Sequence, residues 1–389
     1  MSLERNPGLL ERIASDDVLD SAFVWLCNQR EDYSANNDVW RLRQDWVSVK
    51  AQIHDELLTA TYRFLPVARY PTTDGAVEVW RARDALVLKA IALVLTDHLA
   101  PRLSAHCYHL ADRGGAKAAV RVVADALPAN AFVMRSDVKG YYASLNHQIL
   151  MTLLRQQIAD ERLLILLYDS MQRTVCEGGV YLPVRRGISL GCALSPLLGA
   201  LYLSQLDERM AKTGLIYARF MDDWVVLAPT RWKLRAAVRI VNRTLNELHV
   251  EQHPDKTFIG RTAHGFDFLG YHITTTGLAP ATQSQRNFVQ RIAQLFEQGA
   301  DINRIGQYVA HWLRWLGSGI GTRLADWIAE QGRMAVPVVA QLADGPDTQQ
   351  PRTLASMLRS LTDFGLIFPG CLFELGLGDR PKEQPIHKF

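Results

Sequence analysis

Two adjacent aspartates, Asp222 and Asp223, lie between apolar segments in YARFMDDWVVLAP, and a third, Asp137, ends the apolar run NAFVMRSDV. Neighbouring carboxylates repel one another, and a bound cation removes that cost. Magnesium prefers hard oxygen ligands, so a few carboxylates that leave positions for water and phosphates suit it. This set of residues is typical of two-metal phosphoryl transfer, in which one ion activates an attacking hydroxyl and the other stabilises the leaving group.

Each aspartate also has a purely structural explanation. A pair of aspartates is common at the tip of a hairpin, and Asp137 could cap the segment that follows it. Taken one at a time, the structural explanation is favoured. The catalytic interpretation therefore depends on whether the surrounding elements bring the three side chains together.

The segments around the aspartates have the patterns of regular elements. Residues 130–138 predict a buried strand, and residues 217–229 predict a hairpin with carboxylates at its tip. Residues 232–248 predict a helix whose arginines lie off its apolar stripe. Strand, helix, hairpin and helix in this order indicate a split βαβ sheet with helices on one face. A further strand pair is predicted at 265–273.

The rest of the chain is mainly helical. Residues 1–60 have helical spacing of their apolar residues, and residues 82–99 predict a buried helix because apolar residues occupy most faces. The sequence RYPTTDG at 69–75 predicts a turn between short strands. Helices are predicted again beyond 280, and a tail rich in Pro, Gly and Gln begins at about 336.

The composition is that of an ordinary globular protein. The chain has 389 residues, of which 48% are hydrophobic and 21% are charged, which predicts two or three lobes. The net charge is only +3, so any basic surface must be local. Five scattered cysteines form no CxxC pair, which argues against a disulfide framework or a zinc module and favours the cytoplasm. Neither a signal peptide nor a membrane span is expected.

Five motifs occur in a fixed order: RSDVKGYYASLNH, GISLGCALSP, RFMDDWVVL, HPDKT and FDFLGYH. In order and spacing the chain resembles bacterial reverse transcriptases of the group II intron and retron types, over roughly residues 60–275. The resemblance implies an α+β, right-hand polymerase fold, with fingers, a palm of antiparallel sheet covered by helices on one face, and a helical thumb. The implied domains are an N-terminal helical extension (1–60), fingers and palm (61–275), thumb (276–335) and a tail of unknown role (336–389).

The resemblance also assigns roles at the catalytic centre. Asp137 and Asp222 would be the main metal ligands, aided by the backbone carbonyl of Val138, and two Mg²⁺ ions would bind, with Mn²⁺ as a substitute. Asp223 would face the other side of the hairpin and have a weaker role, because successive strand residues point in opposite directions. Lys256 in HPDKT would protonate the leaving pyrophosphate. A solvated surface lysine is the alternative.

Other residues would select the nucleotide. Tyr142 stands where reverse transcriptases place an aromatic ring that blocks a ribose 2′-hydroxyl, although it could instead be a core residue beside Tyr141. It implies deoxynucleotide substrates. Gly191 would allow close approach of the backbone to the base pair. Leu190 replaces the glutamine that is usual in the family, which places ordinary templating in doubt.

The resemblance also suggests roles for residues outside the catalytic centre. Arg81 and Arg83 are candidates for holding the triphosphate, since Arg suits phosphate contacts. Residues 305–319 resemble a thumb helix whose tryptophans either pack the helices together or rest against a nucleic-acid backbone. In GISLGCALSP, Ser195 followed by Pro196 predicts a helix start with Ser195 as its cap.

The activity implied is RNA-directed DNA synthesis from a primer 3′-end. The expected partners are an RNA template (a dedicated non-coding RNA is one candidate), a DNA primer or product, deoxynucleoside triphosphates, and a partner protein or a second copy of the chain. Little length remains after the thumb for an endonuclease, so a specialised enzyme, such as one in antiviral defence, fits better than a mobile intron protein. The alternatives are an RNA-binding maturase-like scaffold and a polymerase with non-standard templating.

Overall fold

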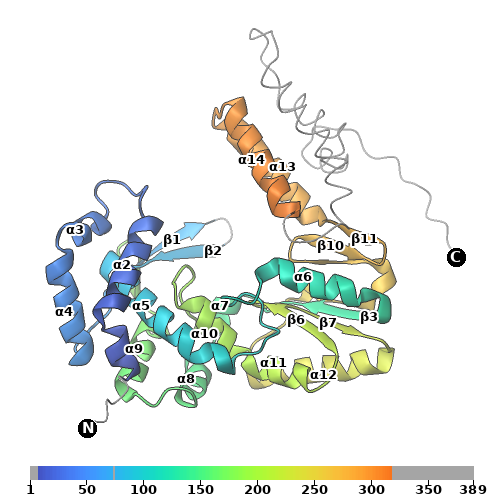
Figure 1. Cartoon of the computed structure of the whole chain (residues 1–389), viewed down its shortest axis with the longest axis horizontal. Coiled ribbons are helices and arrows are strands. Elements are labelled where there is room, and N and C mark those ends of the chain that lie inside the picture. The colour runs from blue at the N-terminus through green and yellow to red at the C-terminus, as the bar shows by residue number, and fades with distance from the viewer. Residues whose placement is uncertain (1–7, 73–74, 318–389) are drawn as a thin grey trace, which may run out of the picture. The chain divides into compact units, whose positions relative to one another are not determined.

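The computed structural model describes residues 8–72 and 75–317 (Figure 1). The chain divides into two compact units. The first comprises Met1–Gly115, Ser136–Val226 and Arg231–Thr257. The second comprises Ala116–Arg135, Leu227–Thr230 and the chain from Phe258 onward. The predicted tail from 336, and the thumb from 318 onward, lie outside the described residues.

The first unit begins with four helices, as the apolar spacing predicts. They are α1 (Leu9–Ile13), α2 (Asp16–Gln29), α3 (Asp38–Gln44) and α4 (Trp46–Leu58). The side chain of Asn37 accepts a hydrogen bond from the backbone nitrogen of Val39 and so caps α3. The helical pattern breaks at Asp45, where α3 ends and α4 begins.

A four-stranded sheet of order β2-β1-β4-β5 belongs to the same unit. Its strands are β1 (Val67–Thr72), β2 (Gly75–Val79), β4 (Thr174–Glu177) and β5 (Val180–Pro183). Strands β1 and β2 form the antiparallel pair expected around the turn at 69–75, whereas β1 pairs with β4 in parallel. The parallel pairing joins segments about a hundred residues apart, and no local sequence pattern predicts it.

The buried helix predicted at 82–99 is α5 (Ala82–Leu99), and α1, α2 and α3 pack against it. Helices α7 to α11 follow later in the chain, and together they carry the loops of the site. Their bounds are α7 (Tyr141–Ser144), α8 (His147–Arg155), α9 (Glu161–Met171), α10 (Ser195–Tyr202) and α11 (Ser204–Ala211).

The strand and hairpin predicted around the aspartates are confirmed. Strands β3 (Phe132–Ser136), β6 (Ile216–Phe220), β7 (Asp223–Ala228) and β8 (Phe258–Arg261) form a sheet of order β6-β7-β3-β8. Strand β7 is almost wholly buried, as befits a central strand, because both of its faces are covered. Helices α11 and α12 (Arg231–Glu247) lie side by side below the β6–β7 hairpin in Figure 1.

The second unit contains α6 (Gly115–Ala126) and a three-stranded sheet of order β11-β10-β9. Strands β9 (Phe266–Phe268) and β10 (Tyr271–Thr274) are the strand pair predicted at 265–273, and β11 (Gly277–Pro280) extends it. Helices α13 (Thr282–Glu297) and α14 (Ile302–Gly317) lie side by side (Figure 1), with the rings of Phe288 and Trp312 stacked at 4.3 Å. The α+β class is therefore confirmed, and Trp312 packs helices together.

Within the described residues, no helix is both long enough and apolar enough to cross a bilayer.

Candidate functional site

The hairpin that carries Asp222 and Asp223 turns at Met221 and Asp222, between the end of β6 and the start of β7. Met221 has φ 55°, a left-handed conformation that a residue with a long side chain adopts only at a cost. Glycine or asparagine is usual in such a turn. The surrounding structure must therefore hold this turn in place.

His109 and Arg219 hold the turn from two sides. The backbone N–H of Met221 donates to Nδ1 of His109 (2.9 Å), and Nη1 of Arg219 donates to the Met221 carbonyl oxygen (2.6 Å). Burial lowers the pKa of His109 to about 4, so its ring is neutral. Because Nδ1 accepts, Nε2 carries the proton, and it lies 3.1 Å from the carbonyl oxygen of Pro196 in α10. No local pattern in the sequence indicates this role for His109.

Arg219 itself belongs to a buried ion pair with Asp207 of α11. Both side chains are fully buried, and two hydrogen bonds of 2.7 and 2.5 Å join them. Burial opposes the charged form, but the Asp207 carboxylate raises the pKa of Arg219 well above its usual value. The hydroxyl of Tyr217 also donates to Asp207, at 2.8 Å. The pair fixes β6 on α11 and aims Arg219 at the turn.

Asp137 follows β3 and is almost fully buried. Its carbonyl oxygen accepts from the backbone nitrogen of His253 (2.9 Å), and its Oδ2 accepts from Nζ of Lys256 (2.7 Å). The other carboxylate oxygen, Oδ1, is buried and has no hydrogen-bond partner. The bridge between Val138 and Gln252 continues this antiparallel pairing.

The ammonium of Lys256 interacts electrostatically with all three aspartates. The hydrogen bond that Lys256 donates to Asp137 raises the pKa of Lys256, and the charges of Asp223 and Asp222 add to the effect. Burial, and after it the charge of Asp137, raises the pKa of Asp222. The three acids predicted from the sequence are thus brought within electrostatic range of one another.

The donor set fits a divalent cation. Asp137 is buried and keeps one unbonded carboxylate oxygen, and the pKa of the nearby Asp222 is raised, which is what a hard cation would relieve. In the described part of the chain, no three His, Cys, Asp or Glu side chains are already arranged around one point. The ammonium of Lys256 occupies one oxygen of Asp137 and leaves the other unbonded.

A cleft of about 460 Å³ opens beside Asp222 and is lined by Tyr142, Leu190, Arg69 and Arg173, among others. Tyr142 is half-buried, and its hydroxyl donates to the sulfur of Met221 at 3.8 Å. Burial, and then the charge of Asp222, raises the pKa of Tyr142 to about 12, so its hydroxyl stays protonated.

Two glycines missed at the sequence level shape this cleft. Gly187 has φ 85°, and a Cβ there would lie 2.8 Å from the backbone of Ala143. A Cβ on Gly199 would lie 3.1 Å from the ring of Tyr141 and 3.2 Å from that of Tyr142. Tyr141 lies deeper than Tyr142, and its hydroxyl donates to the Gly199 carbonyl oxygen at 2.6 Å. A side chain at position 199 would therefore require the two rings to shift by a few tenths of an ångström.

Leu190 and Gly191 are adjacent in the loop before α10, but they line different cavities. Leu190 lines the cleft and is 47% exposed, whereas Gly191 lines a neighbouring cavity of about 280 Å³ that does not include Asp222. Ser195 does not cap α10, contrary to the prediction. It is the first residue of the helix, and its hydroxyl donates to the Ser189 carbonyl oxygen at 2.6 Å, which closes the loop.

The structure does not bring Arg81 and Arg83 to the cleft. Arg83 pairs with Glu56 at 2.8 Å and lies over the ring of Tyr62, and Arg81 is exposed at the start of α5. Neither lines the cleft. Since α5 begins at Ala82, these arginines belong to a helix start that faces the N-terminal helices.

Three other arginines line the cleft beside Asp222: Arg69 of β1, Arg173 and Arg186. Arg173 is buried and donates to both carboxylate oxygens of Glu78 at 2.6 and 2.9 Å, and Arg69 donates to Glu78 at 2.8 Å. They come from segments about a hundred residues apart, so only the β1–β4 pairing reveals them.

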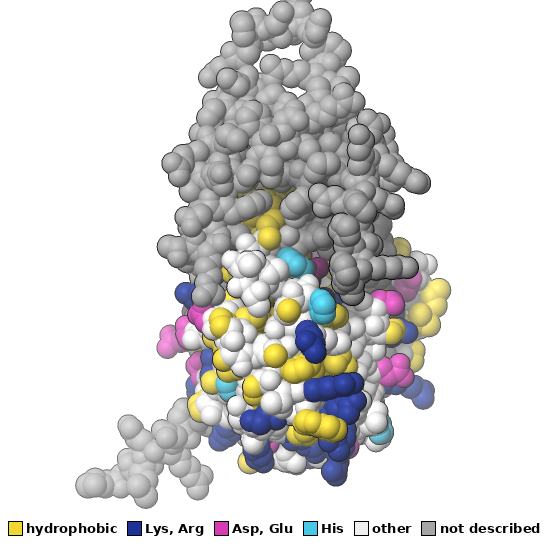
Figure 2. Space-filling model, turned by 90° about the vertical axis from the view of Figure 1, so that its right-hand side faces the viewer, with side chains coloured by type: hydrophobic (Ala, Val, Ile, Leu, Met, Phe, Trp, Pro, Cys, Tyr) yellow, Lys and Arg dark blue, Asp and Glu magenta, His cyan; other side chains and the backbone are white. Residues whose placement is uncertain are grey.

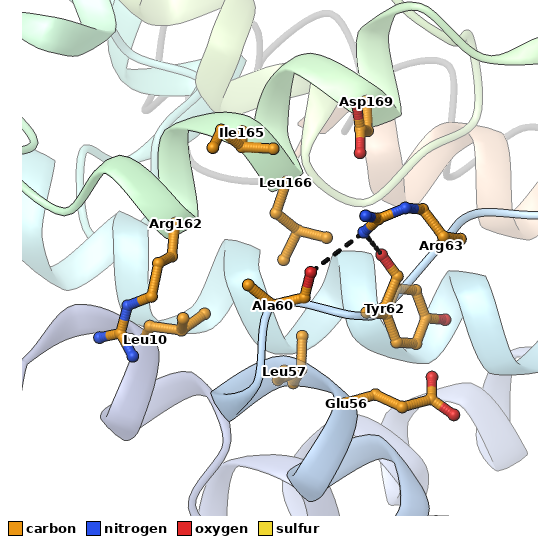
Figure 3. Close-up of a pocket in the computed structure, with 10 residues that line it drawn as sticks. All are labelled: Leu10, Glu56, Leu57, Ala60, Tyr62, Arg63, Arg162, Ile165, Leu166 and Asp169. Carbon is orange, nitrogen blue, oxygen red and sulfur yellow. Dashed lines mark hydrogen bonds between the residues drawn. The ribbon is translucent and has the colours of Figure 1, made fainter.

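A third and much smaller cavity, of about 20 Å³, lies among α1, α4 and α9 (Figure 3). Arg63 donates to the carbonyl oxygens of Ala60 and Tyr62, and Arg162 pairs with Glu11. A space of this size holds about one water molecule, and these arginines are already bonded. This cavity is therefore no substrate site.

The family model described as reverse transcriptase (RNA-dependent DNA polymerase) matches residues 81–273. The chain is 23% identical over 273 residues to protein YkfC of Escherichia coli K12, covering 58% of this chain and 72% of that protein. It is 21% identical over 169 residues to the group II intron-encoded protein LtrA of Lactococcus lactis subsp. cremoris. That match covers 43% of this chain and 28% of LtrA, so the chain spans less than a third of that relative.

Two solved structures are also similar. A partial Cas6-RT-Cas1–Cas2 complex matches with a TM-score of 0.41 and 18% identity, covering 62% of this chain and 42% of that chain. Telomerase from Candida albicans in complex with a fragment of telomeric RNA matches with a TM-score of 0.47 and 12% identity, covering 82% and 62%.

Proposed function

The chain carries a reverse transcriptase domain, and from this premise we propose that it is an RNA-directed DNA polymerase that extends a primer 3′-end with deoxynucleotides. The observation that carries the proposal is that Lys256 bonds to Asp137 and is influenced by the charges of Asp222 and Asp223, with Asp222 lining a cleft of nucleotide size. Sites of this kind bind a ligand in a cleft of roughly 300–1,000 Å³.

Asp137 and Asp222, with the carbonyl of Val138, would hold the divalent ions, and Asp223 would support them. The reverse transcriptase family uses divalent metal ions, and we propose two Mg²⁺, with Mn²⁺ as a substitute. When bound, the ions would activate the primer hydroxyl and stabilise the leaving pyrophosphate. Because Asp137 raises the pKa of Lys256, the Nζ ammonium keeps its proton near neutral pH and can give it to the leaving group.

The cleft residues would position the nucleotide. The ring of Tyr142, backed by Gly199, would lie under the sugar and exclude a 2′-hydroxyl. Arg69 is the partly exposed arginine of the Glu78 network, so it is better placed than Arg81 or Arg83 to contact phosphates.

Primer extension tests the proposal. The wild type should extend a DNA primer on an RNA template with Mg²⁺, and Asp222→Asn should lower the rate by several orders of magnitude, because a shared ligand is lost. Asp55→Asn, which changes an exposed carboxylate on α4, is the matched control and should retain activity. Equal extension by the wild type and Asp222→Asn would overturn the catalytic assignment. RNA binding without synthesis by the wild type would favour a maturase-like scaffold.

A second candidate function is synthesis restricted to particular templates. Leu190 is exposed to the cleft and offers no hydrogen bond to the incoming nucleotide, so positioning would depend on stacking and template geometry. A missing polar contact changes discrimination by about 1–3 kcal/mol. Leu190→Gln should widen the range of RNA templates copied, measured by sequencing products from several unrelated templates. Efficient copying of all of them by the wild type would exclude this candidate.

The proposed function extends to the location, the partners and the biological role of the enzyme. We place the enzyme in the cytoplasm, since four cysteines in the described residues are free, as in a reducing compartment. We also propose that the enzyme works with a dedicated non-coding RNA and with a partner protein or a second copy of the chain. Its proposed biological role is antiviral defence. RNA that co-purifies with the expressed protein is the measurement that tests the first of these.

A further inference from the structure

Helix α12 carries four arginines at a spacing of four residues: Arg231, Arg235, Arg239 and Arg243. All four are exposed, and this spacing places them along one face of the helix, a face we name the arginine ladder. The opposite, apolar face, with Leu234, Val241 and Leu245, is buried in the first unit. The ladder therefore faces solvent along most of the helix.

The ladder is costly for an isolated helix. Like charges at four-residue spacing destabilise a helix by roughly 0.2–0.5 kcal/mol a pair. The helix contains five basic residues and one acid, so it is more positive than the whole chain, whose net charge is +3. That acid, Glu247, pairs with Arg243 and with Arg209 of α11. If the exposed face of α12 only had to be soluble, a mixture of acidic and basic residues would serve equally well.

An exposed tryptophan lies beside the ladder. Trp232 is 73% exposed, and the guanidinium of Arg235 lies over its ring at 5.2 Å. A large exposed ring next to cations can stack on an unpaired base while the arginines contact phosphates. Figure 2 shows one face of the molecule, on which Lys and Arg side chains gather with hydrophobic side chains between them.

The geometry suits a linear polyanion. Four residues of helix rise about 6 Å, a distance of the same order as the spacing of successive phosphates along a nucleic-acid strand. A membrane-surface helix would instead present its apolar face outward, and here that face is buried. None of the residues lining the cleft beside Asp222 belongs to α12.

We infer that the arginine ladder and Trp232 form a second nucleic-acid site, which binds single-stranded RNA outside the catalytic cleft. The choice of RNA rests on the proposed function, because the template strand is what an RNA-directed polymerase must retain while the DNA product grows. The site would hold unpaired RNA and so favour the enzyme's own template over free primer–template hybrid.

Binding of two probes separates this site from the cleft. One probe is a short blunt hybrid of RNA template and DNA primer, and the other is the same hybrid with a single-stranded RNA tail. The wild type should bind the tailed probe more tightly. The double variant Arg235→Gln, Arg239→Gln should lose that gain and bind the blunt hybrid as before, and Trp232→Ala should lose part of it. The exposed arginines Arg41 and Arg155 of other helices provide the control double variant, changed to Gln in the same way.

Salt dependence gives a second readout. Each phosphate contact to a single strand contributes about 0.7 to the slope of log K against log salt concentration, so the ladder double variant should reduce the slope for the tailed probe by about 1.4. An unchanged tail gain or slope would overturn the inference. An equal gain from a single-stranded DNA tail would also overturn it. So would a double variant that keeps its gain for the RNA tail and instead loses binding to phosphatidylserine vesicles. Failure of the proposed polymerase activity would show separately, as absent primer extension with the tail gain intact.

Discussion

The tip of the β6–β7 hairpin and the arginine ladder of α12 both gather charges of one sign, but they deal with the repulsion differently. At the tip, Asp137 and Asp222 are withdrawn from water, the pKa of Asp222 rises, and Lys256 and Arg219 supply opposite charge. On α12 the arginines stay in solvent. Burial makes each charge depend on a specific partner, whereas exposure makes the same repulsion weak. Mutations should therefore have much larger effects in the first region than in the second.

The largest effect is expected at the buried pair beneath the tip. Arg219→Met leaves Asp207 buried and uncompensated, which should lower the free energy of unfolding by about 3–5 kcal/mol, measured by urea denaturation. The double variant Asp207→Leu, Arg219→Met removes both charges and should recover most of that loss. If Arg219→Met alone costs no more than an exposed arginine substitution, burial does not govern this region.

The next effect concerns the wall of the cleft beside the tip. Tyr142→Ala should improve ribonucleotide use relative to deoxynucleotide use by about tenfold to a hundredfold, because the ring no longer excludes the 2′-hydroxyl. The measurement is single-nucleotide incorporation of matched triphosphates. Tyr142→Phe keeps the ring and should behave like the wild type. An unchanged ratio in Tyr142→Ala would reduce this ring to a packing role.

His109 extends the comparison to a neutral group at the tip. Its pKa is about 4 in the folded protein and about 6.5 when exposed, so between these values the unfolded state binds more protons. Stability therefore falls as pH decreases through this window, by at most about 1.4 kcal/mol per pH unit.

Two variants separate the acceptor role of His109 from its titration. In His109→Asn the side-chain oxygen can take the place of Nδ1 and accept from Met221, so activity should be largely kept while the loss of stability below pH 6.5 is reduced. His109→Gln places its amide nearer the Nε2 position and should lose more activity. Denaturation and primer extension at pH 7 and pH 5 provide the comparison, and equal behaviour of the two variants would contradict it.

The smallest effect is expected on the ladder. Arg239→Gln removes the like-charge pairs with Arg235 and Arg243, so it should stabilise the protein by roughly 0.2–0.5 kcal/mol a pair at low salt, with less gain as salt rises. Thermal unfolding at two salt concentrations measures it. A clear destabilisation would mean that Arg239 makes a structural contact. Burial would then not explain why mutations have larger effects at the hairpin tip than on the ladder.

Local sequence patterns suffice to predict the main elements and the candidate acids. Local periodicity predicts β3, the β6–β7 hairpin, α5 and α12, since each is set by the alternation or helical spacing of its own residues. It also places Asp222 at a turn and Asp137 at the end of a strand. The match over residues 81–273 agrees with the family that the motifs indicated.

The residues that support those acids are set by packing between distant parts of the chain. His109 meets Met221 across 112 positions of sequence, because the backbone of 106–108 pairs with Arg219 and carries the imidazole to the turn. Arg69 enters the cleft in place of Arg81 and Arg83, because β1 pairs with β4 while the start of α5 faces the N-terminal helices. Sequence periodicity reports the environment along one element. The partner of a side chain is set by packing between elements distant in the chain, which leaves no local pattern.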